Sequence, residues 1–191
     1  RALIHSGRVR IDGQLCEDPY ADYAPEGLIF SVDEQIWNYR KLAYLLLNKP
    51  ANYECSHKPR HHPSIYTLLP PPLLTRGVQA VGRLDEDTTG LLLFSDDGQF
   101  IHTYTSPKKK VTKVYDVTLK HPGDQLLVAA LLAGVQLNDE PAPIAASACE
   151  ILAERLLRLT TTEGKYHLVK RMIAAAGNRA EGLNRVAIGG L

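Results

Sequence analysis

The hydrophobic pattern of the N-terminal part of the chain is that of a small module. Residues 1–13 combine the end of a helix, a Ser-Gly break and a short alternating strand that an Asp-Gly turn closes. A further apolar run follows, and then a polar stretch, residues 33–41, which predicts a linker. We therefore expect one module over residues 1–38 and a second domain over residues 39–191.

Beyond this stretch, strands and helices alternate without a regular βαβ rhythm. Apolar or alternating runs predict strands, and a period of 3.6 predicts helices. The expected strands span residues 42–48, 78–85, 90–95, 113–120, 146–152 and 155–162. The expected helices span residues 97–104, 124–134 and 166–178. This mixture predicts an α+β domain with a mixed, largely antiparallel sheet flanked by helices.

Composition adds limits to this picture. The 191 residues are 45% hydrophobic and 23% charged, which is typical of a globular protein. No apolar run approaches the ~20 residues of a membrane span, and no signal-peptide pattern opens the chain. Three widely spaced cysteines suggest neither a disulfide framework nor a metal motif. We expect a cytoplasmic monomer without membrane contact, whose natural chain extends beyond Arg1 and beyond the final Gly-Gly-Leu.

Positive charge is concentrated in three short clusters, although the net charge is only +1. The clusters are Lys108, Lys109, Lys110 and Lys113; Lys165, Lys170 and Arg171; and Arg1, Arg8 and Arg10. Such clusters on a nearly neutral chain favour one surface that faces a polyanion. Solvated loops and helix ends are the alternative for each cluster taken alone.

Three segments carry candidate chemistry. Asp85 follows an apolar strand on a turn, where a carboxylate is held rigidly and faces out of the sheet. Near the C-terminus, a Gly loop leads into a helix whose polar face carries His167, Lys170 and Arg171. Tyr115 lies on an alternating strand just after the lysine cluster. The alternatives are a plain acidic turn, a solvated helix face and a core tyrosine.

These three segments together resemble the motifs of the RsuA/RluA-type pseudouridine synthases. The motifs read GRLDEDTTGLLL, KVYDVTL and EGKYHLVKRM, in the family's order, and RALIHSGRVRIDG resembles the back half of an S4 RNA-binding domain. The resemblance covers nearly the whole chain. It implies the pseudouridine synthase catalytic fold with a partial S4 module. The DxDTTGL and GKYHxVKRM variants resemble the branch that acts on 16S ribosomal RNA, and imply uridine 516 as the target.

The resemblance also implies catalytic roles. Pseudouridine formation detaches uracil from ribose and rejoins it through carbon 5, so it is redox-neutral and requires no cofactor or metal. Asp85 would act at the glycosidic bond, as a nucleophile or as a base that removes a ribose proton, and is ionised in either case. Lys170 would lie beside it, where a cation at ~4 Å is worth about 4 kcal/mol at an effective dielectric constant near 20.

The same resemblance assigns substrate contacts. Tyr115 would stack on the flipped uracil and lend its hydroxyl to proton transfer, and Arg83 would stabilise the flipped-out backbone. Val169 would form an apolar wall. The remaining expected RNA contacts are His167, Arg171, Lys108, Lys109, Lys110, Lys113, Arg8 and Arg10. The implied partner is 16S ribosomal RNA in a small-subunit assembly intermediate, contacted largely through phosphates.

Three other functions stay open on sequence grounds. One is the same reaction on a 23S ribosomal RNA or transfer RNA uridine, and another is a non-catalytic RNA-binding assembly factor. The third is a metal hydrolase built on Asp85, Asp87 and the histidines of the segment HKPRHH, although no cysteine or acid is placed to complete a zinc site.

Overall fold

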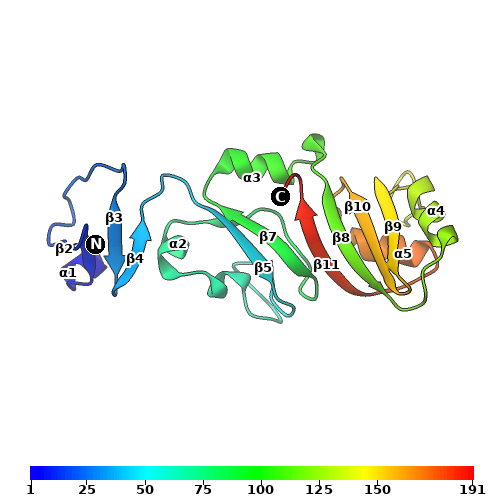
Figure 1. Cartoon of the computed structure of the whole chain (residues 1–191), viewed down its shortest axis with the longest axis horizontal. Helices are drawn as coiled ribbons and strands as arrows, with labels where there is room; N and C mark the ends of the chain where they lie inside the picture. The colour runs from blue at the N-terminus through cyan, green and yellow to red at the C-terminus, as the bar shows by residue number, and fades with distance from the viewer. The chain divides into compact units, whose positions relative to one another are not determined.

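The computed structural model describes all residues, 1–191, and divides the chain into two compact units (Figure 1). Unit 1 comprises Arg1–Ala43 and unit 2 comprises Tyr44–Leu191. None of the helices has the length and apolar character that a membrane crossing requires.

Unit 1 is a short helix followed by a four-stranded antiparallel sheet. The helix α1 spans Ala2–His5, and the strands are β1 (Val9–Ile11), β2 (Gln14–Leu15), β3 (Ile29–Val32) and β4 (Gln35–Asn38). Their order is β2-β1-β3-β4. The predicted helix end, strand and Asp-Gly turn are confirmed.

The polar stretch 33–41, predicted as a linker, instead contains β4, so that prediction is wrong. Asp33 and Glu34 have φ angles of 50° and 67° and form a two-residue hairpin turn between β3 and β4. The turn pairs Val32 with Gln35. A polar strand with one half-buried residue carries too little hydrophobic alternation to be recognised in isolation.

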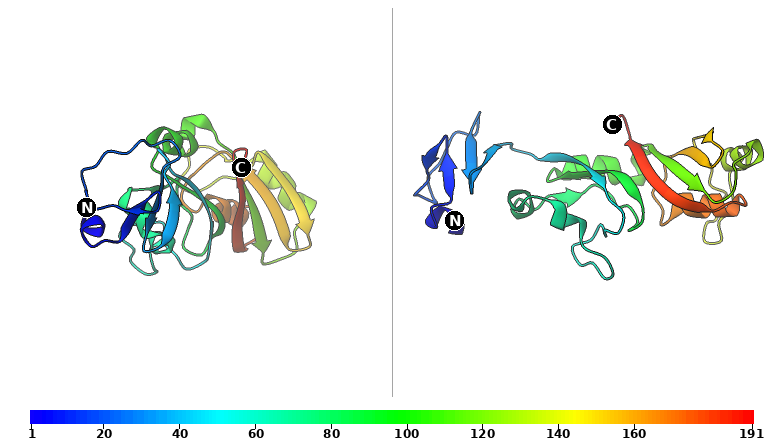
Figure 2. Two further views of the ribbon diagram at one scale, coloured as in Figure 1. Left: turned by 60° about the vertical axis from the view of Figure 1, so that its left-hand side comes forward. Right: turned by 60° about the horizontal axis from the view of Figure 1, so that its bottom comes forward.

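Unit 2 contains a seven-stranded sheet in the order β5-β7-β11-β8-β10-β9, with β6 also paired to β7 (Figures 1 and 2). The strands are β5 (Tyr44–Lys49), β6 (Gln79–Ala80), β7 (Thr89–Ser95), β8 (Lys113–Leu119), β9 (Ala148–Ala153), β10 (Leu156–Thr161) and β11 (Ala180–Ile188). Only β7 and β11 run parallel, and every other strand pair is antiparallel. The predicted mixed, largely antiparallel sheet is therefore confirmed.

Four α-helices and two 3₁₀ turns accompany the sheet. They are η1 (Ile65–Leu68), α2 (Pro71–Thr75), α3 (Gly98–Thr105), η2 (Pro107–Lys109), α4 (Gln125–Ala133) and α5 (Leu168–Ala175). The helices predicted at 97–104 and 124–134 are confirmed, and the side chains of Asp97 and Asp124 cap their first turns.

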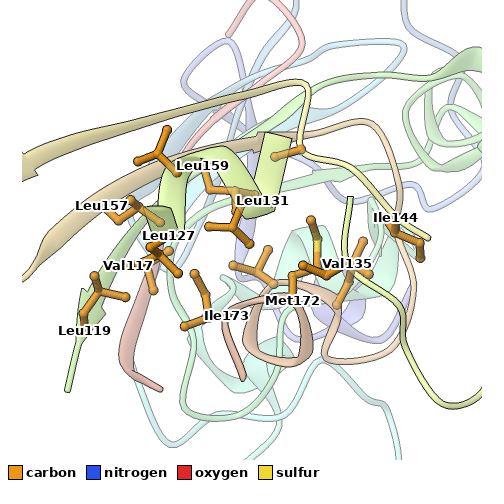
Figure 3. Packing of buried hydrophobic residues seen from close by; sticks show 14 of the residues in the cluster. Val117, Leu119, Leu127, Leu131, Val135, Ile144, Leu157, Leu159, Met172 and Ile173 are labelled. Atoms are coloured by element: carbon orange, nitrogen blue, oxygen red, sulfur yellow. The ribbon is translucent and has the colours of Figure 1, made fainter. Parts of the chain in front are cut away.

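The main hydrophobic core lies between one half of the sheet and the helices α4 and α5 (Figure 3). β8 contributes Val117 and Leu119, in line with the predicted alternation of that strand. The other labelled members come from β10, α4, the following loop and α5: Leu157, Leu159, Leu127, Leu131, Val135, Ile144, Met172 and Ile173. Burying each such side chain contributes about 1.5–3 kcal/mol, so this cluster fixes α5 against the sheet.

The sheet differs from the sequence prediction at three strands. β11, at its centre, was not predicted, because its run Ala180–Ile188 mixes Glu, Asn and Arg with apolar residues. β5, predicted as buried, is an edge strand on which Leu46 is 66% exposed. The segment 78–85 forms a strand only at Gln79–Ala80, and the remainder makes the loop that carries Asp85.

Gly90 allows β7 to approach β11 closely. Its φ is +100°, and a Cβ there would lie 2.3 Å from the backbone oxygen of Arg185. Side chains cannot be accommodated at that distance, so the residue must be glycine. The close approach places the loop that precedes β7 beside the centre of the sheet.

Candidate active site

Lys49 holds the loop that carries Asp85 through hydrogen bonds to its backbone. This lysine is the last residue of β5, and it is fully buried. Its Nζ donates hydrogen bonds to the backbone oxygens of Pro50 (3.1 Å), Glu86 (2.9 Å) and Thr88 (2.9 Å). The sequence predicts a strand that ends just before Lys49 but not this role, since the carbonyls of Glu86 and Thr88 lie far away in the sequence.

The charge of Lys49 is balanced by acidic neighbours. Burial lowers the pKa of Lys49, and the nearby Cys55, Asp87 and Asp85 act in the opposite direction. A buried ammonium group that supplies all its donors to backbone carbonyls fixes the path of the loop.

We expect Lys49→Met to destabilise the protein by about 3 kcal/mol or more, because three backbone oxygens lose their donor. Urea unfolding would measure the loss, with Lys120→Met as the control, since Lys120 is an exposed lysine just after β8. A Lys49→Met protein as stable as the Lys120→Met protein would show that the three bonds do not hold the loop.

The carboxylate of Asp85 lies between two side chains of the C-terminal motif, Lys170 and His167. Its Oδ2 is 3.4 Å from Nζ of Lys170, and its Oδ1 is 3.4 Å from Nε2 of His167. The Asp85 side chain is 22% exposed. The expected placement of Lys170 beside Asp85 is confirmed.

Lys170 also binds a second carboxylate, which sequence analysis did not assign to this role. Its Nζ donates to both Asp87 oxygens, at 2.6 and 2.8 Å, and is thus closer to Asp87 than to Asp85. Partial burial opposes the charged forms, but the hydrogen bond and ion pair raise the pKa of Lys170 and lower that of Asp87. Lys170 therefore stays protonated, with Asp87 as the group that orients it.

The sequence predicted His167 on the polar face of a helix, but the residue lies just before α5. The helix begins at Leu168, and His167 has a left-handed backbone with φ 47° and ψ 29°. Its ring stacks on that of Tyr166, with the centroids 3.8 Å apart. A left-handed conformation is unfavourable for a non-glycine residue, and here it turns the imidazole toward Asp85.

Asp85 lies where a cavity and a wider groove meet, since it lines both. The cavity has a volume of about 150 Å³, and Tyr115, Arg83, Val169, His167 and Lys113 are among its lining residues. Val169 is 4% exposed and provides an apolar wall. The structure thus brings together most of the residues that sequence analysis proposed for the site.

The groove has a volume of about 710 Å³, and both basic and acidic side chains line it, the acidic ones being Glu54, Asp85, Glu86 and Asp87. Its basic residues are Arg60, His61, Arg83, Lys165, His167 and Lys170. The exposed Tyr166 also lines it. Positive charge next to an exposed aromatic ring is the combination that single-stranded nucleic acid binds.

Several proposed RNA contacts lie outside both hollows. Arg171 pairs with Asp139 and donates to the backbone oxygen of Tyr166. Lys108, Lys109 and Lys110 are exposed at and just after η2 but do not line the cavity or the groove. Arg8 and Arg10 belong to unit 1, where Arg8 pairs with Asp33.

The segment HKPRHH is organised by Glu54. The Glu54 carboxylate accepts backbone N–H bonds from Arg60, His61 and His62, and these bonds lower its pKa to about 2. His57 is bound to Gln79 and stacks on a tyrosine ring. No three His, Cys, Asp or Glu side chains anywhere in the chain converge in a way that could hold a metal ion.

The fold and the site are those of an enzyme that modifies RNA, in which the Asp85 carboxylate lies between Lys170 and His167 where a cavity and a wider groove meet. Residues 43–175 match the family of RNA pseudouridylate synthases. The chain belongs to this family and is an isomerase that acts on RNA.

Curated relatives agree with the family match. The chain is 39% identical to the ribosomal small subunit pseudouridine synthase A of Haemophilus influenzae over 97% of this chain and 80% of that protein. It is 37% identical to the protein of the same name from Escherichia coli, over 98% of this chain and 81% of that protein.

Solved structures give the same result. A crystal structure described as a pseudouridylate synthase superposes with a TM-score of 0.75 at 37% identity, covering all of this chain and 81% of the other. A chain of an H/ACA ribonucleoprotein bound to a substrate RNA shares the fold, with a TM-score of 0.51 at 16% identity, over 76% of this chain and 47% of that one.

Proposed function

We propose that this enzyme converts one uridine of 16S ribosomal RNA to pseudouridine, with Asp85 as the catalytic residue. The observation that carries this proposal is the position of Asp85 between Lys170 and His167, where the cavity and the groove meet. The names of the curated relatives support the small-subunit RNA as substrate. We further propose uridine 516 as the target, an assembly intermediate as the substrate form and the cytoplasm as the location.

In this proposal, the target base leaves its stack and enters the cavity, which costs a few kcal/mol of unstacking. Asp85 acts at the sugar, either bonding to C1′ or removing the proton at C2′. Both routes need the carboxylate form, and the ammonium group of Lys170 lies 3.4 Å from it. Asp87 keeps Lys170 oriented.

The surroundings of Asp85 have matching roles. Tyr115 stacks on the uracil and its hydroxyl takes part in proton transfer, while Val169 closes the apolar side. Arg83 is exposed and lines both hollows, so it can hold the backbone of the flipped nucleotide. Arg60 and Lys165 of the groove contact neighbouring phosphates, which position the RNA without reading its sequence.

We propose that unit 1 is an S4-like module that tethers the RNA through Arg8 and Arg10. Deleting residues 1–43 should weaken binding to a 16S fragment and flatten its salt dependence, because fewer counterions are released. At saturating RNA, the rate should stay within roughly tenfold of the intact enzyme, since only uniform binding is removed. A folded deletion variant with unchanged affinity and a collapsed rate would contradict this division of labour.

The direct test is to map pseudouridines in ribosomal RNA from cells with and without this protein. We expect one pseudouridine in 16S RNA to disappear and to return with the wild-type gene but not with the Asp85→Asn gene. If a pseudouridine of 23S or transfer RNA disappears instead, that RNA is the substrate. An unchanged map would favour the non-catalytic binder.

A further inference from the structure

Two polar side chains of the cavity are buried, and each has one polar atom without a hydrogen-bond partner in the protein. Arg185 is 4% exposed and Thr88 is 1% exposed, and both line the cavity together with Asp85 and Tyr115. Nη2 of Arg185 and Oγ1 of Thr88 make no hydrogen bond to any protein group. Buried polar atoms are nearly always paired, so a ligand that supplied both partners would be bound favourably.

Arg185 is fixed in place by the sheet. It lies on the central strand β11, opposite Tyr115 of β8, and its Nε donates to the backbone oxygen of Leu91 at 2.7 Å. The pairing of β11 with β7 ends at Arg185 and Gly90. One edge of the guanidinium therefore holds the point where the two strands separate, and Nη2 is left buried and unpaired.

Thr88 is positioned by the loop that carries Asp85. Its backbone N–H donates to the backbone oxygen of Asp85, and its own backbone oxygen accepts from Nζ of Lys49. The backbone of Thr88 is therefore held at both groups, in the same loop as the catalytic carboxylate.

The charge around Arg185 favours an electron-rich partner. Lys113 lines the same cavity, and burial together with repulsion from Arg185 lowers the pKa of Lys113. Asp85 and Glu163 are the acidic residues that line the cavity, and Asp85 is already flanked by Lys170 and His167. A guanidinium group can only donate hydrogen bonds, so its free partner must be an acceptor.

We propose that Arg185 donates a hydrogen bond to a carbonyl oxygen of the target uracil, and that the Thr88 hydroxyl accepts one from the neighbouring N3–H. Uracil presents a carbonyl on each side of N3–H, which matches a donor next to a group that can accept. The assignment rests on the proposed function, because it requires a uridine as the substrate.

This contact would stabilise the reaction and not only the bound base. When the bond between C1′ and N1 breaks, its electron pair stays on the uracil, and the negative charge is shared by O2 and O4. An electron pair at C5 then forms the new bond to C1′, the C5 proton leaves and N1 gains a proton. A buried, preorganised donor at a carbonyl oxygen binds the charged base more strongly than the neutral one.

The test combines variants with altered substrates. A 16S fragment carries tritium at C5 of the target, which is uridine, 2-thiouridine or 4-thiouridine, and tritium release is followed in a single turnover at saturating RNA. We expect Arg185→Met to react about a hundredfold more slowly with uridine than the wild type does. One of the two thio analogues should slow the wild type but should not slow Arg185→Met further. The carbonyl that this analogue replaces is the one to which Arg185 donates.

A matched arginine provides the control. Nε of Arg155 also donates to a backbone oxygen, that of Leu119, at 2.9 Å, but Arg155 does not line the cavity. Arg155→Met should therefore react at nearly the wild-type rate. Thr88→Ser should retain activity, whereas Thr88→Val should lose about tenfold, because only valine removes the hydroxyl.

If each thio analogue slows the wild type and a folded Arg185→Met by the same factor, the proposal is overturned. Arg185 would then only stabilise the sheet. If Arg185→Met does not fold, Arg185→Lys keeps a cation for Leu91, and the same coupling is measured with it. Equal activity of Thr88→Val and Thr88→Ser would remove Thr88 from the contact. A wild-type enzyme that releases no tritium from uridine would instead contradict the proposed function itself.

Discussion

Asp85→Asn is expected to turn over its RNA at less than about a hundredth of the wild-type rate. The amide has nearly the same shape as the carboxylate, so the loop, which Lys49 holds, keeps its path. Neither a nucleophile nor a base can be made from the amide, so both routes at the sugar are lost. Affinity for RNA should change only a few-fold, because the groove is intact. Tritium release from a 5-labelled 16S fragment gives the rate, and filter binding gives the affinity.

The matched control is Glu86→Gln, the same chemical change one residue later in the loop. Glu86 is about half exposed, its carboxylate lies 3.7 Å from Nε2 of His62, and it does not line the cavity. Its variant should keep most of the wild-type rate. Turnover by Asp85→Asn above about a hundredth of wild type, with Glu86→Gln unaffected, would contradict the assignment of Asp85 as the catalytic residue.

The second large effect is expected for Tyr115→Phe, which should lose about a hundredfold in rate with little change in RNA affinity. The ring remains beside the core residues of β8, so stacking on the uracil survives. Only the hydroxyl is removed, and a general acid or base contributes at least about that factor. Single-turnover rates and binding constants, measured on the same RNA, separate the two effects.

Two further variants complete this test. Tyr115→Ala should lose binding as well, since stacking is worth about 1–3 kcal/mol per base. Tyr44 lies on the edge strand β5, and its hydroxyl donates to Asp97. Tyr44→Phe removes this hydroxyl and should leave the rate unchanged. Equal rates for Tyr115→Phe and wild type would show that the hydroxyl has no part in proton transfer.

Local sequence determined most of the elements of this protein. Strands such as β7 and β8 and the helices α3 and α4 follow from apolar periodicity and from Asp caps, which act over a few residues. Periodicity and capping depend on a residue's sequence neighbours, so they can be read without knowing the fold. The candidates Asp85, Tyr115 and Lys170 came instead from the resemblance of three motifs to a known family.

Only the tertiary structure decided the contacts between distant segments. The roles of Lys49 and Arg185 cannot be read from the sequence, because each side chain binds backbone oxygens 37 or more residues away. The central strand β11 is equally invisible, since its polar residues serve the cavity and the junction with β7. The left-handed turn at His167 brings the imidazole to Asp85 against the local preference for helix. Burial and long-range hydrogen bonding outweigh local propensity at these positions, and there the sequence alone carries no signal.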